Sequence, residues 1–102
     1  MDEPKGHVDL LLLALLEDGD AHGYGLVESL RERSGGAFEL AEGTVYPALY
    51  RLERRRLVAS AWETVGGRRR RVYRLTRSGR GELARQRSDW QAFARAVESV
   101  LA

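Results

Sequence analysis

The sequence predicts an α+β fold that is mainly helical, namely a winged helix-turn-helix with a C-terminal dimerisation helix. Three observations predict it. Residues 42–56 have the apolar spacing of an amphipathic helix, and a hairpin pattern with a Gly66-Gly67 turn follows over residues 57–75. Basic charge gathers in the same region: residues 51–80 hold 11 basic and 2 acidic side chains, against 6 and 13 in the rest of the chain. Such segregation is typical of a surface that faces a polyanion.

Composition excludes several classes of function. The chain has 102 residues, a net charge of +2 and no cysteine, so it is one small globular unit without disulfides, thiolate metal sites or a cysteine nucleophile. Its two histidines, His7 and His22, lack partners at ligand spacing, and we expect no metal and no cofactor. The sequence shows no nucleophile–base arrangement, paired catalytic carboxylates or phosphate-cradling loop, so we do not expect an enzyme.

The first predicted helix covers residues 7–17. Its apolar run, Leu10 to Leu16, is far shorter than the roughly 20 residues that span a bilayer, and the residues before it do not form a secretory signal. We therefore expect a cytoplasmic protein with no membrane partner. Because this helix is apolar on nearly every side, its own small domain is expected to leave one face for a second subunit. The candidate contacts are Leu11, Leu12 and Leu15.

The second helix is predicted over residues 21–33, with Asp20 as its N-cap and Ser34-Gly35-Gly36 at its end. In this helix Gly23 and Gly25 are expected to allow close helix approach. Residues 38–40 form a short extended link, which is a candidate third strand beside the hairpin.

The third predicted helix, residues 42–56, is the candidate recognition helix. Val45, Ala48, Leu49 and Leu52 share its inner face. Because Pro47 lacks an N–H, we expect the regular helix to begin near Gly43 or Thr44. An α-helix fits the major groove, where a threonine can read bases and tyrosine hydroxyls suit phosphates; Arg51 could bind guanine or phosphate. The candidate DNA-binding residues here and on the preceding helix are Tyr24, Gly43, Thr44, Tyr46, Pro47, Tyr50, Arg51 and Arg54.

The wing is predicted over residues 57–75, with strands at 57–65 and 72–75 and a tip at 66–71. Arg68, Arg69, Arg70 and Arg71 complete the candidate DNA-binding set, through contacts with the backbone or the minor groove. Alternation along a strand sends neighbouring side chains to opposite faces, so only some of the four can face one duplex. Trp62 is interpreted as a packing residue, and Arg55 and Arg56 as structural or solvated.

The last helix is predicted to begin after the N-cap Thr76 and to run to about Leu101. Its apolar positions have a near-heptad spacing that suits packing against another helix. Leu83, Trp90, Phe93 and Val97 are therefore candidate dimer-interface residues. We expect two parts, a DNA-binding domain over residues 1–76 and a helix over residues 77–102 that packs on the first helix of the partner. A two-fold dimer would require a roughly palindromic DNA site.

These motifs together resemble the PadR family of bacterial transcriptional regulators. The matching segments are His22-Gly-Tyr-Gly-Leu26, Gly43-Thr-Val-Tyr-Pro-Ala-Leu49, Arg51-Leu-Glu53, Gly66-Gly-Arg-Arg-Arg-Arg-Val-Tyr-Arg-Leu-Thr76 and Gly79, in that order. The single C-terminal helix is similar to the compact branch of that family. One departure is Ala41, where many members have a Ser or Thr cap ahead of the recognition helix.

The resemblance implies a homodimeric repressor at a two-fold symmetric operator, with double-stranded DNA as its partner. It also implies a candidate small aromatic effector at the dimer interface, where Trp90 and Phe93 lie; plain packing of these rings is the alternative. The other functional class consistent with the residues is a winged-helix module for protein docking or nonspecific nucleic-acid binding. The Thr, Tyr and Arg composition of the third helix favours a sequence-specific DNA binder.

Overall fold

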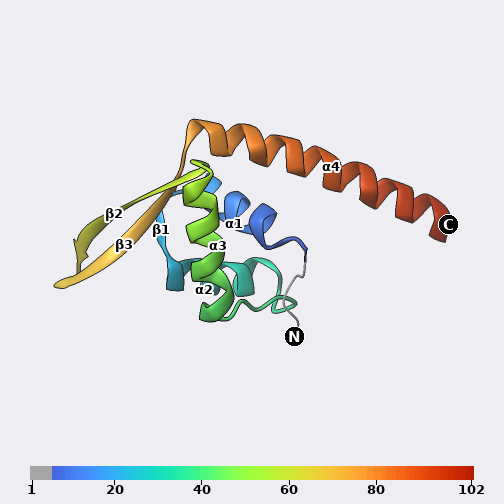
Figure 1. The fold of residues 1–102 in the computed structure, drawn as a ribbon. Helices are drawn as coiled ribbons and strands as arrows, with labels where there is room; N and C mark the ends of the chain where they lie inside the picture. Colours follow the sequence, from blue (N-terminus) through green and yellow to red (C-terminus); the bar gives the residue numbers. More distant parts are fainter. Residues whose placement is uncertain (1–5) are drawn as a thin grey trace.

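The computed structural model describes residues 6–102, so the first five residues of the expected DNA-binding part lie outside it. Four helices and a small antiparallel sheet follow one another as predicted for a winged helix-turn-helix, which confirms the fold class (Figure 1). The elements are α1 (Val8–Glu17), β1 (Ala21–His22), α2 (Gly23–Arg33), α3 (Glu42–Arg54), β2 (Val58–Val65), β3 (Arg68–Leu75) and α4 (Arg77–Leu101).

The three strands have the order β1-β3-β2, and β2 and β3 form a hairpin in continuous antiparallel register. Gly66 and Gly67 have φ values of 58° and 79°, the left-handed conformation that a two-residue hairpin turn requires. Two expectations are wrong here. Residues 68–71 lie within β3 rather than in the hairpin tip, because the two-residue turn lets pairing start at Arg68. The third strand is Ala21–His22, which pairs with β3, and not residues 38–40.

The start of α2 also differs from the prediction. The N-cap is His22, whose Nδ1 accepts a hydrogen bond of 3.1 Å from the backbone N–H of Gly25. Asp20 does not cap this helix, because Ala21 and His22 are extended and paired with β3. His22 therefore takes the capping role that was expected of Asp20.

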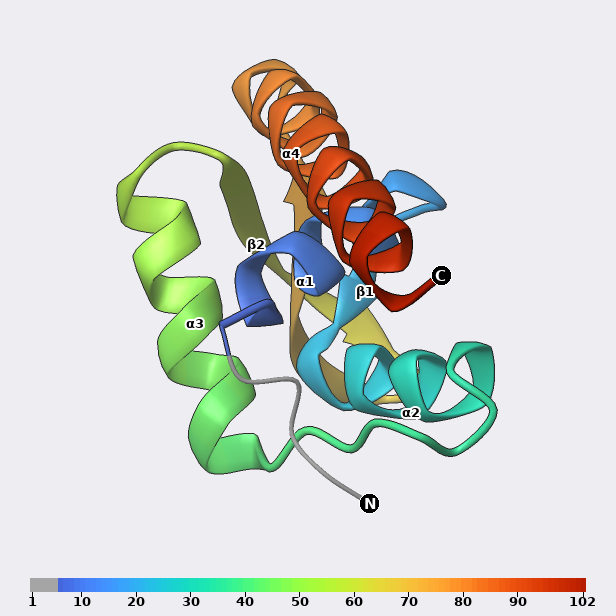
Figure 2. The same cartoon turned by 90° about the vertical axis from the view of Figure 1, so that its right-hand side faces the viewer.

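A single core lies between the helices and the root of the sheet. It includes the predicted inner face of α3 and most of α1. Leu12 and Leu83 are buried within this protomer's own core and leave almost no surface for a partner, contrary to the expectation, whereas Leu15, at 8% exposed, borders a hollow beside α1. The domain encloses more of α1 than expected because α4 covers it (Figure 2). Leu11 remains partly exposed.

The helix α3 begins at Glu42, as the predicted range indicated, and Pro47 lies inside it. Pro47 has no N–H to donate to the backbone carbonyl four residues earlier in the helix. Because Pro47 is exposed, water can hydrate that carbonyl instead. The preceding Ala41 has no side-chain oxygen for a cap, as the sequence indicated. The helix ends in a Schellman motif: Leu57 N–H donates to the carbonyl of Leu52, and Arg56 takes φ 62°. Arg56 thus has a structural role through its backbone, while its side chain is exposed.

The helix α4 is capped by Thr76, whose hydroxyl oxygen accepts a hydrogen bond of 3.0 Å from the N–H of Gly79. Its first half packs on α1 of the same protomer, and its second half projects from the body (Figure 1). Of the helices described, none has both the length and the apolar composition needed to cross a membrane.

Candidate nucleic-acid interface

The side of α3 opposite the core carries the predicted DNA-binding residues. Tyr46, Pro47 and Tyr50 are exposed, with Tyr50 at 61%. The Tyr50 hydroxyl accepts a 3.4 Å hydrogen bond from Arg54, whose guanidinium also lies 5.8 Å from the centre of the Tyr50 ring. This pair therefore presents a cation and an aromatic hydroxyl together, a combination suited to a phosphate.

Arg51 is held in a different way. Its Nη2 lies 3.6 Å from a carboxylate oxygen of Asp9 on α1, and its side chain is 59% exposed. The ion pair is weak at this exposure, so a phosphate or a base could replace Asp9. Arg51 stays a predicted DNA contact, with Asp9 as an intramolecular competitor.

A hollow of about 410 Å³ lies between α2, α3 and the wing. It gathers tyrosines from three elements and arginines from β3. Its lining residues are His22, Tyr24, Tyr46, Trp62, Arg69, Arg70, Arg71 and Tyr73. Burial raises the pKa of Tyr73, at the root of the sheet, above its ordinary value. The hollow thus brings Tyr24, Tyr46 and the wing arginines, far apart in the sequence, to one surface.

The positioning of Tyr46 depends on Gly23. A Cβ built on Gly23 would lie 2.5 Å from Cε1 of the Tyr46 ring, so α2 and α3 approach closely only because residue 23 has no side chain. Gly25 was also expected to allow close helix approach, but it is not needed for that. The nearest atoms to a Cβ built there belong to the His22 ring, at an ordinary distance of 3.5 Å.

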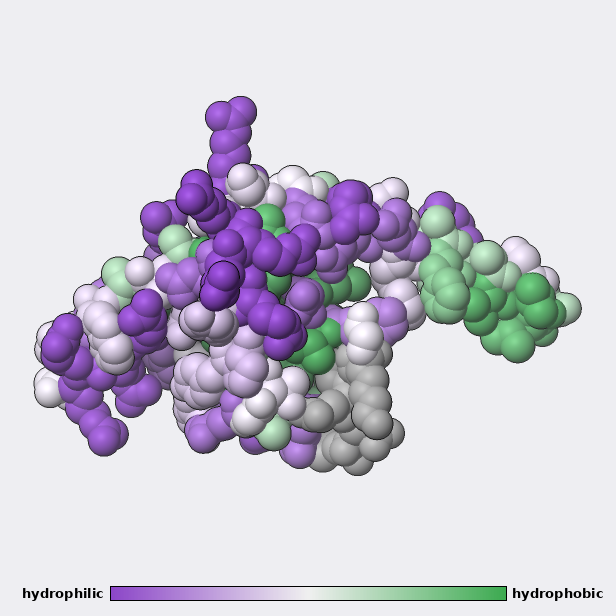
Figure 3. Space-filling model, in the orientation of Figure 1, coloured by the Kyte–Doolittle hydropathy of each residue, from purple (hydrophilic) through white to green (hydrophobic). Residues whose placement is uncertain are grey.

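Hydrophilic side chains dominate the molecule over α3 and the wing, whereas hydrophobic residues gather at the free end of α4 (Figure 3). This end carries several large apolar side chains that the protomer does not cover. Phe93 is 59% exposed and Val100 is 83% exposed. The Trp90 ring contacts His7 edge-on at 5.0 Å and lies 5.9 Å from the Phe93 ring. The predicted residues Trp90, Phe93 and Val97 are therefore accessible to a partner.

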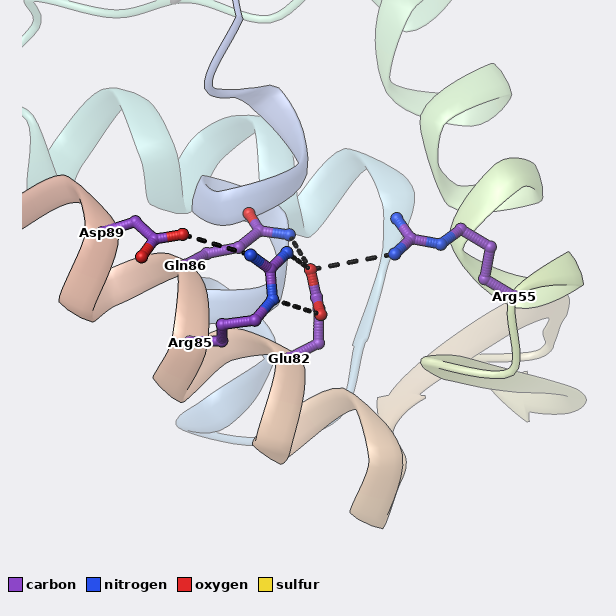
Figure 4. A network of polar contacts seen from close by, with 5 residues as sticks. All are labelled: Arg55, Glu82, Arg85, Gln86 and Asp89. Atoms are coloured by element: carbon purple, nitrogen blue, oxygen red, sulfur yellow. Dashed lines mark hydrogen bonds and ion pairs between the residues drawn. The ribbon is translucent and has the colours of Figure 1, made fainter.

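A charged network joins α3 to α4 (Figure 4). Glu82 accepts hydrogen bonds from Arg85, with a shortest distance of 2.5 Å, and from Gln86 at 2.6 Å. Arg55, directly after α3, lies 3.8 Å from the same carboxylate. The hydrogen bonds from Arg85 and then Gln86 lower the pKa of Glu82 to about 2. Arg55, which was interpreted as structural or solvated, thus links the end of α3 to the first half of α4.

From the sequence, Trp62 is expected only to pack, and neither Glu53 nor Ser60 has an expected role. Trp62 is 55% exposed and lies beside two wing arginines, with guanidinium carbons 5.3 Å (Arg69) and 5.4 Å (Arg71) from its ring centre. The signal was available, because a two-residue turn at Gly66-Gly67 fixes the register that places residue 62 opposite residue 71. The described part of the chain contains no group of three or more His, Cys, Asp or Glu residues that could hold a metal ion.

Comparison with known proteins agrees with this geometry. The model of the Transcriptional regulator PadR-like family matches residues 12–85. Transcriptional regulator Rv3488 of Mycobacterium tuberculosis is 39% identical over 93 residues, which cover 91% of this chain and 84% of that protein. A PadR family transcription regulator of Clostridium difficile has a similar structure, with a TM-score of 0.84, 33% identity, and coverage of 95% of this chain and 100% of that chain. A transcriptional regulator of Clostridium thermocellum aligns with a TM-score of 0.85 at 27% identity, over 93% of each chain.

Proposed function

Because this chain belongs to the Transcriptional regulator PadR-like family, we propose that it is a sequence-specific, homodimeric repressor that binds a pseudo-palindromic operator. The family and these relatives are transcriptional regulators rather than enzymes. One observation carries the proposal: Tyr46 of α3 and the wing arginines Arg69, Arg70 and Arg71 border one hollow. The proposal places the protein in the bacterial cytoplasm, on the nucleoid when it is bound to DNA.

In this proposal α3 lies in the major groove and the wing follows the adjacent backbone or minor groove. Thr44 would read bases, Arg51 would bind a guanine or a phosphate, and Tyr50 with Arg54 would bind phosphate. Specificity would then depend on few side chains, while the arginines would provide most of the salt-dependent affinity.

The dimer is proposed to form through the second half of α4, with a second copy of this chain as its occupant. Apolar hollows of about 270 and 370 Å³ run along α1 and share Leu11, Ala14 and Phe38. These hollows are apolar, as is the uncovered side of α4, and exposure of that side in a monomer would be unfavourable. Two-fold symmetry would place two copies of α3 about one DNA turn apart.

A small aromatic effector is proposed for the same region. The hollow of about 370 Å³ is bordered by Leu10, Phe38 and Trp90, with Arg87 at its edge. Such walls suit a flat apolar ring. The test is a titration of the dimer with aromatic compounds, followed by the fluorescence of Trp90 in a Trp62→Phe variant that lacks the second indole. If no compound quenches this fluorescence, this part of the proposal is excluded.

The experiment for DNA recognition is selection from a random duplex pool at near-physiological salt. We expect enrichment of one pseudo-palindrome, to which Arg54→Ala should bind about tenfold more weakly. Arg95→Ala removes the same charge from the projecting half of α4, away from the wing, and should bind normally. Retention of DNA with no shared motif would instead favour the module for docking or nonspecific nucleic-acid binding.

The dimer has a separate test. Val97→Glu introduces a charge into the uncovered apolar side of α4, and we expect sedimentation of this variant as a monomer at micromolar concentration. Ala92→Glu, on the opposite side of the same helix, should remain dimeric. If the unaltered protein sediments as a monomer, the proposed operator geometry is wrong.

A further inference from the structure

The two faces of the wing differ in their chemistry. In the β2–β3 register Trp62 lies opposite Arg71 and Thr64 lies opposite Arg69, and residues directly opposite each other share a face. Tyr73 is on the same face and is buried at its root, so this face is turned toward the body of the domain. We call it the inner face of the wing. Alternation places Arg68 and Arg70, with Glu63, on the outer face, although Arg70 is partly buried and also borders the hollow.

Arg71 is tied to α3 from this inner face. The Ser60 hydroxyl donates a 2.8 Å hydrogen bond to Oε2 of Glu53 and accepts a 2.9 Å hydrogen bond from Nε of Arg71. Nη2 of Arg71 also lies 3.8 Å from the same Glu53 oxygen. Since Glu53 belongs to α3 and the other two residues to the strands, these contacts join the helix to the wing.

Trp62 extends the connection to Arg69. Its ring is within cation–π distance of both guanidinium groups, at 5.3 Å for Arg69 and 5.4 Å for Arg71. With 55% of its surface exposed, this tryptophan contributes little to the core. A shared ring restricts two long side chains before DNA arrives, which reduces the entropy that binding must remove.

We propose that Glu53, Ser60, Arg71 and Trp62 are positioning residues, forming a brace that holds the wing at a fixed angle to α3 and directs Arg69 to DNA. The inference rests on the proposed DNA binding and separates the two inner-face arginines of the wing by role. Arg71 acts mainly through the brace, and Arg69 is the cation that the brace presents.

The first test uses the sign of a charge effect. Glu53→Gln removes a negative charge from the DNA-facing side, so its charge alone would make the variant bind DNA more tightly. The brace predicts the opposite, a loss of about tenfold in affinity measured by fluorescence anisotropy on the selected duplex. Glu63→Gln is the matched control: Glu63 is exposed on the outer face and makes no ion pair within the described chain, so this variant should bind as tightly or slightly more tightly.

A double-mutant cycle tests the connection through Trp62. Trp62→Ala should weaken binding and lower the slope of log affinity against log salt by about 1, as Arg69→Ala does. In the Arg69→Ala background the further change Trp62→Ala should have less than half of its original effect, because its target is absent. Trp62→Phe retains a ring and should recover most of the affinity.

Ser60→Ala removes only the bridging hydroxyl and provides a second variant, and thermal unfolding of every variant checks that it is folded. If the unaltered protein binds its operator, two results would overturn the brace. One is equal or tighter DNA binding by Glu53→Gln, and the other is full additivity of the effects of Trp62→Ala and Arg69→Ala. Failure of the unaltered protein to bind any duplex would instead overturn the proposed function, and with it the purpose of the brace.

Discussion

Replacement of Gly79 by alanine should destabilise the protein, although alanine is the better helix former. A Cβ built on Gly79 overlaps the backbone carbonyl oxygen of Leu57 and lies 2.6 Å from Cδ1 of Leu75. The same carbonyl accepts a 3.1 Å hydrogen bond from the N–H of Thr76, at the junction of β3 and α4. Since the overlap is with backbone, it cannot be relieved by rotation of a side chain.

The magnitude follows from opposing contributions. Helix propensity favours alanine by about 1 kcal/mol. Forcing a methyl group into a filled site costs about 1–3 kcal/mol, and disturbing the Leu57–Thr76 hydrogen bond costs about 1 kcal/mol more. We therefore expect Gly79→Ala to lower the free energy of unfolding by about 2 kcal/mol, or about 10 °C in Tm.

Gly81 provides a matched control in the same helix. It is exposed, and a Cβ there would have no neighbour within 4 Å, so Gly81→Ala should raise the free energy of unfolding by about 1 kcal/mol. Urea unfolding followed by circular dichroism would measure both variants at one protein concentration, because dimerisation would add a concentration dependence. If Gly79→Ala proved as stable as Gly81→Ala, the argument from the Leu57 carbonyl would be refuted.

Three further predictions concern other parts of the fold. Glu82→Gln should lower the free energy of unfolding at pH 7 by about 1 kcal/mol, a value limited by the exposure of Arg85. Because the pKa of Glu82 is lowered to about 2, its contribution to stability is full above pH 4.5 and is lost as the pH falls toward 2. The urea unfolding curves of Glu82→Gln and the unaltered protein should therefore converge between these pH values. A difference in stability that does not change with pH would contradict this role of Glu82. Gly23→Ala should displace the Tyr46 ring and weaken operator binding about fivefold in an anisotropy titration, the equivalent of one lost hydrogen bond, with little change in Tm. Arg56→Gly should raise the free energy of unfolding by about 1 kcal/mol in urea, since φ is 62° there; a less stable variant would show that the arginine side chain outweighs its backbone strain.

The elements that the sequence predicted best depend on local rules. The spacing of Val45, Ala48, Leu49 and Leu52 predicted the buried face of α3, and Thr76 was correctly identified as a cap. Gly66-Gly67 correctly marked the hairpin turn, because only a left-handed backbone closes a two-residue loop of this kind. Each of these features is decided by residues a few positions apart.

The errors involve contacts between distant segments. Asp20 has the right chemistry for a cap, but pairing of Ala21 and His22 with β3 moves the start of α2 past it. Leu12 and Leu83 were assigned to an interface because the sequence does not reveal that α4 folds back over α1. The roles of the wing arginines likewise depend on whether Trp62 or Glu53 lies beside each of them.

By itself the sequence determined the class of the fold, the family, and the segment where basic charge meets an exposed helix face. Periodicity, turn residues and charge density are properties of short segments, so they can be read directly along the chain. Only the tertiary structure decided which leucines the core encloses. It also decided that Arg71 is tied to α3 through Ser60, whereas Arg69 lies beside the Trp62 ring. Those outcomes depend on the distances between segments far apart in sequence, which are fixed when the helices pack against the root of the sheet.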